Sequence, residues 1–418
     1  MKKIILSACS VIFAGTLLAE DAAAPKTELT FSVKGTVYAT AFESIVKETG
    51  GSYSAFRMRP SVSFSNGSTD AVLGLEYDAL FGAETSDDDK SSENVGISAD
   101  KKGLEVAQAF VKTKVAAFEG LTLEGGIDTV DFPIVFGDNI PMLAAFYEND
   151  KMSLGIYYLK TFEGDYMDNN DSEIYATDLT VKMGENSIRP AFFAYKSAKG
   201  AEVGQYEDGV GYMPALALNL VFGTAGVDFA GVYAAGKNKV TDVKYAAYAF
   251  DIAPYYSMSE TVKLTGFFTM VSGDDPDTAD KDESFMNSAI DGTSSGINLW
   301  RLYIIEDGGS FTTESDVAGS GKYESTAGYM AAGARVEAQF GDVSTKFTAA
   351  YIRALQTPSG TKKDMGIELD ANIGYEIAKG STLYVEGAYL KSGKFYEKGG
   401  AVDIQNAYYG NIGLNYEL

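Results

Sequence analysis

The sequence predicts an all-β fold, a transmembrane antiparallel up-and-down β-barrel of about 16–18 strands. Three observations predict it. Apolar and polar residues alternate with period two along most of the 418-residue chain. Short turns alternate with long acidic loops, and no change in composition or linker divides the chain. A soluble β-sandwich shows the same alternation, but at this length it would normally divide into domains joined by visible linkers.

The strand pattern begins at residues 29–39, where Leu29 and Phe31 alternate with Thr30 and Ser32. Segments 55–64 and 70–81 repeat it. The same alternation returns at 105–117, 121–130, 152–162, 173–183, 188–197, 214–222, 226–235, 241–252, 261–272, 328–340, 342–352, 363–377, 382–391 and 406–418, and more weakly at 142–148 and 297–305. An even number of strands is expected for a bacterial barrel whose two ends lie on the same side of the membrane.

The connections between these segments are of two kinds. The tight turns are 66–68, 184–186, 223–224, 341–342 and 378–381, and the long polar loops are 83–103, 163–172, 198–211, 273–296 and 306–327. Short turns at one end and long loops at the other are typical of outer-membrane barrels. Paired aromatic residues lie near strand ends, where we expect an interfacial girdle: Tyr157-Tyr158, Phe192-Phe193, Tyr255-Tyr256, Phe267-Phe268 and Tyr408-Tyr409.

The amino terminus predicts export. Lys2 and Lys3 precede residues 4–19, which carry no charge, so we interpret 1–19 as a signal peptide and 20–418 as a single barrel domain. The apolar run is shorter than the ~20 residues of a spanning helix. Cys9, the one cysteine, lies in this run, and the chain has no histidine. The mature protein would therefore lack disulfides, thiolate nucleophiles and imidazole ligands, which argues against an enzyme.

The last predicted strand, 406–418, has a pattern that is similar to a known family signal. Tyr408, Ile412 and Leu414 alternate with polar or small residues, and the sequence ends on Leu418. This resembles the carboxyl-terminal signal that the barrel-assembly machinery recognises in Gram-negative outer-membrane proteins, which usually ends in Phe. Residues 366–418 are also similar to the closing strands of large porins, including the alginate-export type, although none of that family's ligand-binding residues is matched. The resemblance implies the cell outer membrane as location, the assembly machinery as a partner of 406–418, and a homotrimer.

If the apolar faces contact lipid, the opposite faces line the lumen. This parity gives the predicted pore-lining residues Arg57, Arg59, Lys112, Lys114, Arg335, Lys346, Glu76, Asp78, Asp128, Glu368 and Asp370. Charges of both signs across a channel select solutes by charge and dipole, although such charges also serve simply to solvate the wall. Arg57 and Arg59 are the strongest candidates, because two guanidinium groups on one strand face keep their charge at any working pH.

Acidic loops are the remaining candidates for chemistry. Asp87-Asp88-Asp89, residues 168–173 and residues 274–283 would bind Ca²⁺ or Mg²⁺ weakly, and such ions would bridge them to lipopolysaccharide phosphates. None has calcium-loop spacing, so solvated loop tips are the favoured interpretation, and no cofactor or catalytic site is predicted. The formal net charge of −24 argues against nucleic acid as a partner.

These observations predict a water-filled channel for passive diffusion of ions and small hydrophilic solutes, with a cation preference that follows from the negative charge. The alternative is a surface-exposed structural or adhesive barrel with an occluded lumen, and residues 273–327 are the segment that would fold inward to occlude it. An energy-coupled transporter is disfavoured, because that class has ~22 strands and a plug domain before the first strand.

Overall fold

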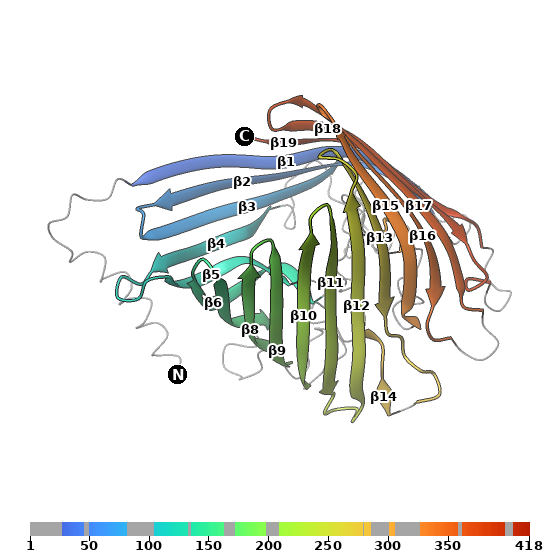
Figure 1. Ribbon diagram of the computed structural model, residues 1–418, viewed down its shortest axis with the longest axis horizontal. Helices are drawn as coiled ribbons and strands as arrows, with labels where there is room; N and C mark the ends of the chain where they lie inside the picture. The colour runs from blue at the N-terminus through green and yellow to red at the C-terminus, as the bar shows by residue number, and fades with distance from the viewer. Residues whose placement is uncertain are drawn as a thin grey trace, which may run out of the picture.

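A computed structural model describes residues 27–45, 50–81, 104–132, 135–162, 172–197, 209–278, 280–285, 301–305, 327–357, 362–397 and 404–418. Within these residues the chain is all-β, and eighteen strands close into one antiparallel barrel (Figure 1). Among the same residues no helix is long and apolar enough to cross a membrane. The predicted signal peptide 1–19 lies outside the described residues and stays a prediction.

The wall follows chain order. Its first nine strands are β1 (Glu28–Glu43), β2 (Gly50–Ser65), β3 (Thr69–Phe81), β4 (Leu104–Lys114), β5 (Leu121–Phe132), β6 (Phe136–Glu148), β7 (Met152–Phe162), β8 (Ser172–Met183) and β9 (Asn186–Lys196). The next nine are β10 (Val210–Phe222), β11 (Ala225–Lys237), β12 (Lys244–Ser257), β13 (Val262–Val271), β15 (Tyr329–Phe340), β16 (Val343–Ala354), β17 (Asp364–Ala378), β18 (Ser381–Ser392) and β19 (Ala407–Glu417). The two-residue strand β14 (Lys281–Asp282) pairs in parallel with the start of β12 and lies outside this order.

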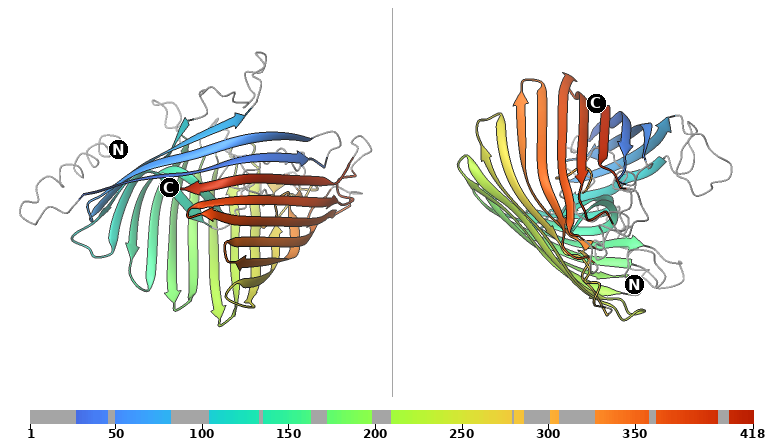
Figure 2. Two further views of the ribbon diagram at one scale, coloured as in Figure 1. Left: turned by 90° about the horizontal axis from the view of Figure 1, so that it is seen from above. Right: turned by 90° about the vertical axis from the view of Figure 1, so that its right-hand side faces the viewer.

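The barrel closes where β1 pairs with β19 (Figure 2, left, blue beside red). The backbone N–H of Val33 donates to the carbonyl of Leu418 at 3.0 Å, and that of Leu418 donates back to Val33 at 2.9 Å. Lys34 Nζ lies 2.8 Å from a Glu417 carboxylate oxygen across the same seam. Closure leaves no sheet edge, which a strand structure requires in a bilayer.

The turns predicted at 66–68, 184–186, 223–224, 341–342 and 378–381 all fall at one end of the barrel, which we call the short-turn end, although the three-residue connection between β5 and β6 lies at the other end. At the β2–β3 turn, the side-chain oxygen of Asn66 accepts hydrogen bonds from the backbone N–H groups of Ser68 and Thr69, at 3.0 and 2.7 Å. Gly67 has a φ of 82°, a conformation that residues with a Cβ avoid. The predicted separation of short turns from long loops is confirmed, and the wide connections all lie at the other, long-loop end.

Side chains alternate between an outer and an inner face. The outer face carries large exposed apolar residues, such as Phe31, Leu369 and Ile412. The paired aromatics do not form one girdle as expected, because neighbours in a strand point to opposite faces. Phe192 and Tyr408 are 45% and 44% exposed, whereas the residues after them, Phe193 and Tyr409, are buried inside.

Every strongly alternating segment of the sequence is a wall strand, and the weaker segment 142–148 is the second half of β6. The prediction of about 16–18 strands is therefore confirmed at its upper bound. The other weak candidate, 297–305, is wrong over residues 301–305, which are not in a strand. Residues 297–300 lie outside the described part of the chain.

Candidate pore lining and constriction

Residues 301–305, here called the inner segment, come from the connection between β13 and β15 and lie inside the barrel. Leu302, Tyr303 and Ile304 are at most 3% exposed. They belong to one buried cluster with inner-face residues of several wall strands, including Ala331 of β15 and Ile352 of β16. The inner segment therefore narrows the lumen next to the strands of the second half of the chain.

A buried ion pair fixes the start of the inner segment. Arg301 donates from Nε to Asp251 Oδ1 of β12 at 2.8 Å, and its Nη2 bonds Oδ2, so the pair is bidentate. Thr269 of β13 donates to the same Oδ1 at 2.8 Å, and the Arg301 guanidinium lies 5.5 Å from the ring of Phe267. Asp251 is 2% exposed. Hydrogen bonds to both oxygens compensate for burying the carboxylate.

Backbone contacts fix the rest of the inner segment. Arg335 of β15 donates from Nη2 to the carbonyl of Arg301 at 2.6 Å and from Nε to Thr348 of β16 at 3.0 Å. The carboxylate of Glu368, in β17, accepts the backbone N–H groups of Ile304 and Ile305 at 2.6 and 3.2 Å. These polar groups would otherwise be unpaired inside the barrel, so side chains of the wall supply the partners that a strand ladder would give.

An aromatic and polar network supports the segment from the β18–β19 side. The Tyr303 ring meets the Tyr409 ring edge-on at a centroid distance of 6.4 Å. Tyr409 Oη donates to Glu386 Oε1 at 2.7 Å, and the side-chain amides of Asn411 and Asn372 donate to the two oxygens of Glu386 at 3.0 and 3.1 Å. Glu386 is thus held in place by three donors from β17 and β19.

Three predicted pore-lining residues meet at this constriction. Arg335 and Glu368 contact the inner segment directly, and Asp370 lies opposite Thr348 in the β16–β17 register, next to the Arg335 hydrogen bond. These contacts show that the polar face of β15 and β17 points into the barrel. The influence of these residues on solutes stays a proposal.

A second group of predicted residues gathers on β2 and β3. Arg57 donates from Nε and Nη2 to the two oxygens of Asp78 at 2.8 and 2.7 Å, and its Nη2 lies 3.2 Å from Glu76. Arg59 forms a further ion pair with Glu76. The two arginines also border a hollow of about 340 Å³ beside Lys34, near the short-turn end of the closing seam. The expected pair of guanidiniums on one face is therefore neutralised by two carboxylates.

The remaining candidates of the first half are spread along β4 and β5. Lys112 lies 3.3 Å from Glu124 and 4.6 Å from the centre of the Phe146 ring. Lys114 donates to the carbonyl of Gly67 at 3.0 Å, so it closes a turn. Asp128 accepts from Gln108 at 2.7 Å. Lys114 therefore has a structural partner at the barrel rim, while the other two belong to the inner wall.

Several important inner-wall residues were missed by the sequence reasoning. These are Asp251, Arg301, Glu386 and the ion pair of Arg189 with Asp178, whose Nε–Oδ2 distance is 2.8 Å. Parity along β8, β9 and β18 was sufficient to place Asp178, Arg189 and Glu386 inside. No signal in the sequence paired Arg301 with Asp251, because fifty residues separate them.

In the described part of the acidic loops, carboxylate side chains accept hydrogen bonds from backbone N–H groups of the same loop. Asp274 accepts the backbone N–H of Glu283 at 3.2 Å, and Asp282 accepts that of Ser284 at 2.8 Å. Burial raises the pKa of Asp274, and the Glu283 side chain raises the pKa of Lys281. No group of three potential metal ligands occurs among the residues that the structure describes. Asp87-Asp88-Asp89 and 168–171 lie outside them.

No protein-family model and no curated protein matches this sequence. Crystal structures of outer-membrane porins match the fold. Acinetobacter baumannii OccAB1 has a TM-score of 0.61 at 10% identity, over 95% of this chain and 99% of that one. Pseudomonas aeruginosa OccK5 (OpdH) has a TM-score of 0.59 at 9% identity, over 94% of this chain and 98% of that one. P. aeruginosa OccK8 (OprE) has a TM-score of 0.58 at 12% identity, over 94% of this chain and 98% of that one. The chain therefore has the fold of these porins.

Proposed function

We propose that this protein is an outer-membrane porin through which ions and small hydrophilic solutes diffuse. The observation that carries the proposal is a closed wall of eighteen strands with an apolar outer face and a charged inner face. Barrels of 16–18 strands are wide enough for an aqueous channel. The inner segment narrows this channel, so solutes would pass beside it according to size and charge.

The test is the conductance of the refolded full-length protein in a planar lipid bilayer. We expect discrete, uniform current steps in potassium chloride, because a charged lumen of this width conducts hydrated ions. A bilayer with protein refolded after deletion of the β18–β19 region serves as the control, because that chain lacks the closing seam. Barrels that insert into the bilayer and produce no steps above leak would contradict the proposal.

An occluded barrel with a structural or adhesive role is the second candidate. The inner segment favours it, because its buried position leaves less open cross-section than an empty barrel has. The two functions predict different changes in conductance when the inner segment is released from the wall. A channel would already conduct and would then conduct more, whereas an occluded barrel would conduct only after release.

The ion preference follows from the charge of the inner wall, and we expect cations to be preferred. Replacing Arg57 and Arg59 together with glutamine should strengthen this preference, because Glu76 and Asp78 would lose their counter-charges. The reversal potential in a salt gradient measures it, and Lys182→Gln, an exposed lysine paired with Glu148, is the control. Anion preference in the unmodified protein would show that local cations outweigh the net charge.

Partners follow from the same proposal. Outer-membrane lipid would contact the apolar outer face, and lipopolysaccharide would contact the long-loop end. The barrel-assembly machinery would recognise residues 406–418, of which 407–417 form β19 beside the closing seam. A homotrimer remains a proposal that chemical cross-linking of the detergent-solubilised protein tests.

A further inference from the structure

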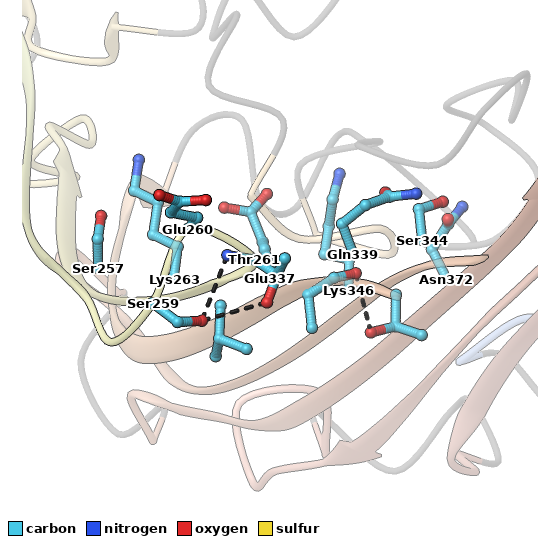
Figure 3. Close-up of a pocket in the computed structure, with 13 residues that line it drawn as sticks. Ser257, Ser259, Glu260, Thr261, Lys263, Glu337, Gln339, Ser344, Lys346 and Asn372 are labelled. Carbon is cyan, nitrogen blue, oxygen red and sulfur yellow. Dashed lines mark hydrogen bonds between the residues drawn. The ribbon is translucent and has the colours of Figure 1, made fainter. Parts of the chain in front are cut away.

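A polar hollow of about 500 Å³ lies at the short-turn end, where β12, β13, β15, β16 and β17 meet (Figure 3). Ser257, Lys263, Glu337, Ser344, Lys346 and Asn372 are among the residues that line it. Small-molecule sites commonly have volumes of ~300–1,000 Å³. The hollow is therefore large enough for a small organic solute.

The hollow faces the lumen. Glu337 is two residues along β15 from Arg335, and Asn372 is four residues along β17 from Glu368, so both share the face that contacts the inner segment. At about 3.3 Å per residue, Asn372 lies roughly 13 Å from Glu368 along the strand. A solute that passes the inner segment would reach the hollow before it leaves at the short-turn end.

The two charged residues at the centre of the hollow, Glu337 and Lys346, are not joined in an ion pair. Some facing residues of opposite charge in the wall form ion pairs, as Arg57 does with Asp78 at 2.7 Å and Lys112 with Glu124 at 3.3 Å. Glu337 and Lys346 also face each other directly, across β15 and β16. Within the described chain, neither makes an ion pair, and Figure 3 shows both side chains pointing into the hollow.

Neighbouring groups make the site polar without adding net charge. Lys263 lies over the ring of Tyr255 at 4.1 Å, and the exposed Glu260 lines the hollow beside it. Two lysines and two glutamates therefore balance, so the hollow attracts neither free anions nor free cations by net charge. The best complement is a solute that itself carries both charges.

We propose that the hollow is a binding station for small zwitterionic solutes, in which Glu337 binds an ammonium group and Lys346 binds a carboxylate. The hydroxyl groups of Ser257 and Ser344 and the side-chain amide of Asn372 would bind further polar atoms. This inference rests on the proposed channel function and names a class of solute for it. It applies to α-amino acids and comparably small dipolar molecules.

L-serine is the probe, and the readout is the interruption of single-channel current by added solute. Serine should interrupt the current at concentrations at least tenfold lower than L-lactate, which lacks the ammonium group, or L-serinamide, which lacks the carboxylate. Glu337→Gln and Lys346→Gln should each raise the dissociation constant for serine by about tenfold to a hundredfold, because each removes one charged hydrogen bond. Lactate as effective as serine would overturn the proposal in favour of an anion site.

A charge exchange separates binding from general damage. The double variant Glu337→Lys with Lys346→Glu keeps both charges in reversed positions, so it should recover most of the serine binding that either glutamine variant loses. The control is Glu148→Gln with Lys182→Gln, an ion pair at the same end on β6 and β8, which should leave serine binding unchanged. No recovery in the exchanged variant, with an intact barrel, would contradict the assigned roles.

Failure of this inference is distinguishable from failure of the proposed function. If the protein gives current steps in potassium chloride but serine does not interrupt them, the proposed channel function stands and the proposed binding of zwitterionic solutes in the hollow is overturned. Calorimetric titration of serine into the refolded protein in detergent measures the same dissociation constant without current. Binding there in a barrel that does not conduct would support the station and overturn the channel.

Discussion

Replacing Asp251 with alanine is expected to raise the single-channel conductance. The side chain accepts hydrogen bonds from Nε and Nη2 of Arg301 and from the Thr269 hydroxyl, so its removal leaves a buried arginine without its carboxylate. Removing one partner of a buried ion pair costs about 3–5 kcal/mol. At 1.4 kcal/mol per factor of ten, the docked position of the inner segment becomes at least a hundredfold less favourable.

Single-channel recordings at fixed salt and voltage measure this effect. Asp228→Ala is the matched control, because Asp228 lies on the neighbouring strand β11 and accepts its hydrogen bond from Asn219, at 2.7 Å. Its loss should leave the conductance close to that of the unmodified protein. Equal conductance in the Asp251→Ala variant, with the barrel folded, would show that the inner segment does not restrict ion flow.

Replacing Gly126 with alanine should destabilise the barrel. Gly126 has a φ of 139°, and a Cβ there would lie 2.1 Å from the carbonyl oxygen of Ala109 on the neighbouring strand. The backbone conformation alone costs about 1–3 kcal/mol for a residue with a Cβ. The free energy of unfolding by urea in lipid vesicles should therefore fall by at least this amount, and the folded fraction after refolding should fall with it.

Gly125→Ala is the adjacent control. A Cβ at Gly125 meets only the end of the Leu143 side chain, at 3.1 Å, and this methyl group can move. We expect little change in its unfolding midpoint. Similar losses in both variants would mean that glycine in this strand matters for flexibility during folding rather than for the close approach of β4.

The wall could be predicted because its rule is local. Each strand needs one face for lipid and one for the lumen. Leu369 and Glu368 are neighbours in β17, so their positions alone predict that they lie on opposite faces. Glycine turns then set the hairpins, as at Gly67. The segment 142–148 was weaker because β6 begins with residues 136–141, which include Gly137 and Pro141 and do not alternate.

The constriction could not be predicted, because its contacts are non-local. Residues 301–305 alternate like a strand, and only the buried wall around them shows that they lie inside. The inner face of β12 opposite them carries Ala247 and Ala249, both at most 1% exposed. An apolar residue on that face is buried inside the barrel and does not contact lipid, so the simple parity rule fails there.

Which charged residues form ion pairs with each other also could not be predicted from the sequence. Parity placed Arg57 and Asp78 on the same face, but only the β2–β3 register brings them opposite each other. The register likewise sets Glu337 against Lys346, where no ion pair forms among the described residues. Residue type and face were therefore predictable, whereas the distinction between neutralised and available charges was not.

The closing seam has a consequence for how the protein is made. β1 can pair with β19 only after β19 has been synthesised, because the partners of Lys34, Thr36 and their neighbours are residues 408–417. Contacts of such large sequence separation slow folding. All the other strands of the wall are therefore synthesised before the first strand finds its second partner, and until then a row of unpaired backbone groups is open to aggregation. Holding chaperones would have to protect the chain throughout that interval.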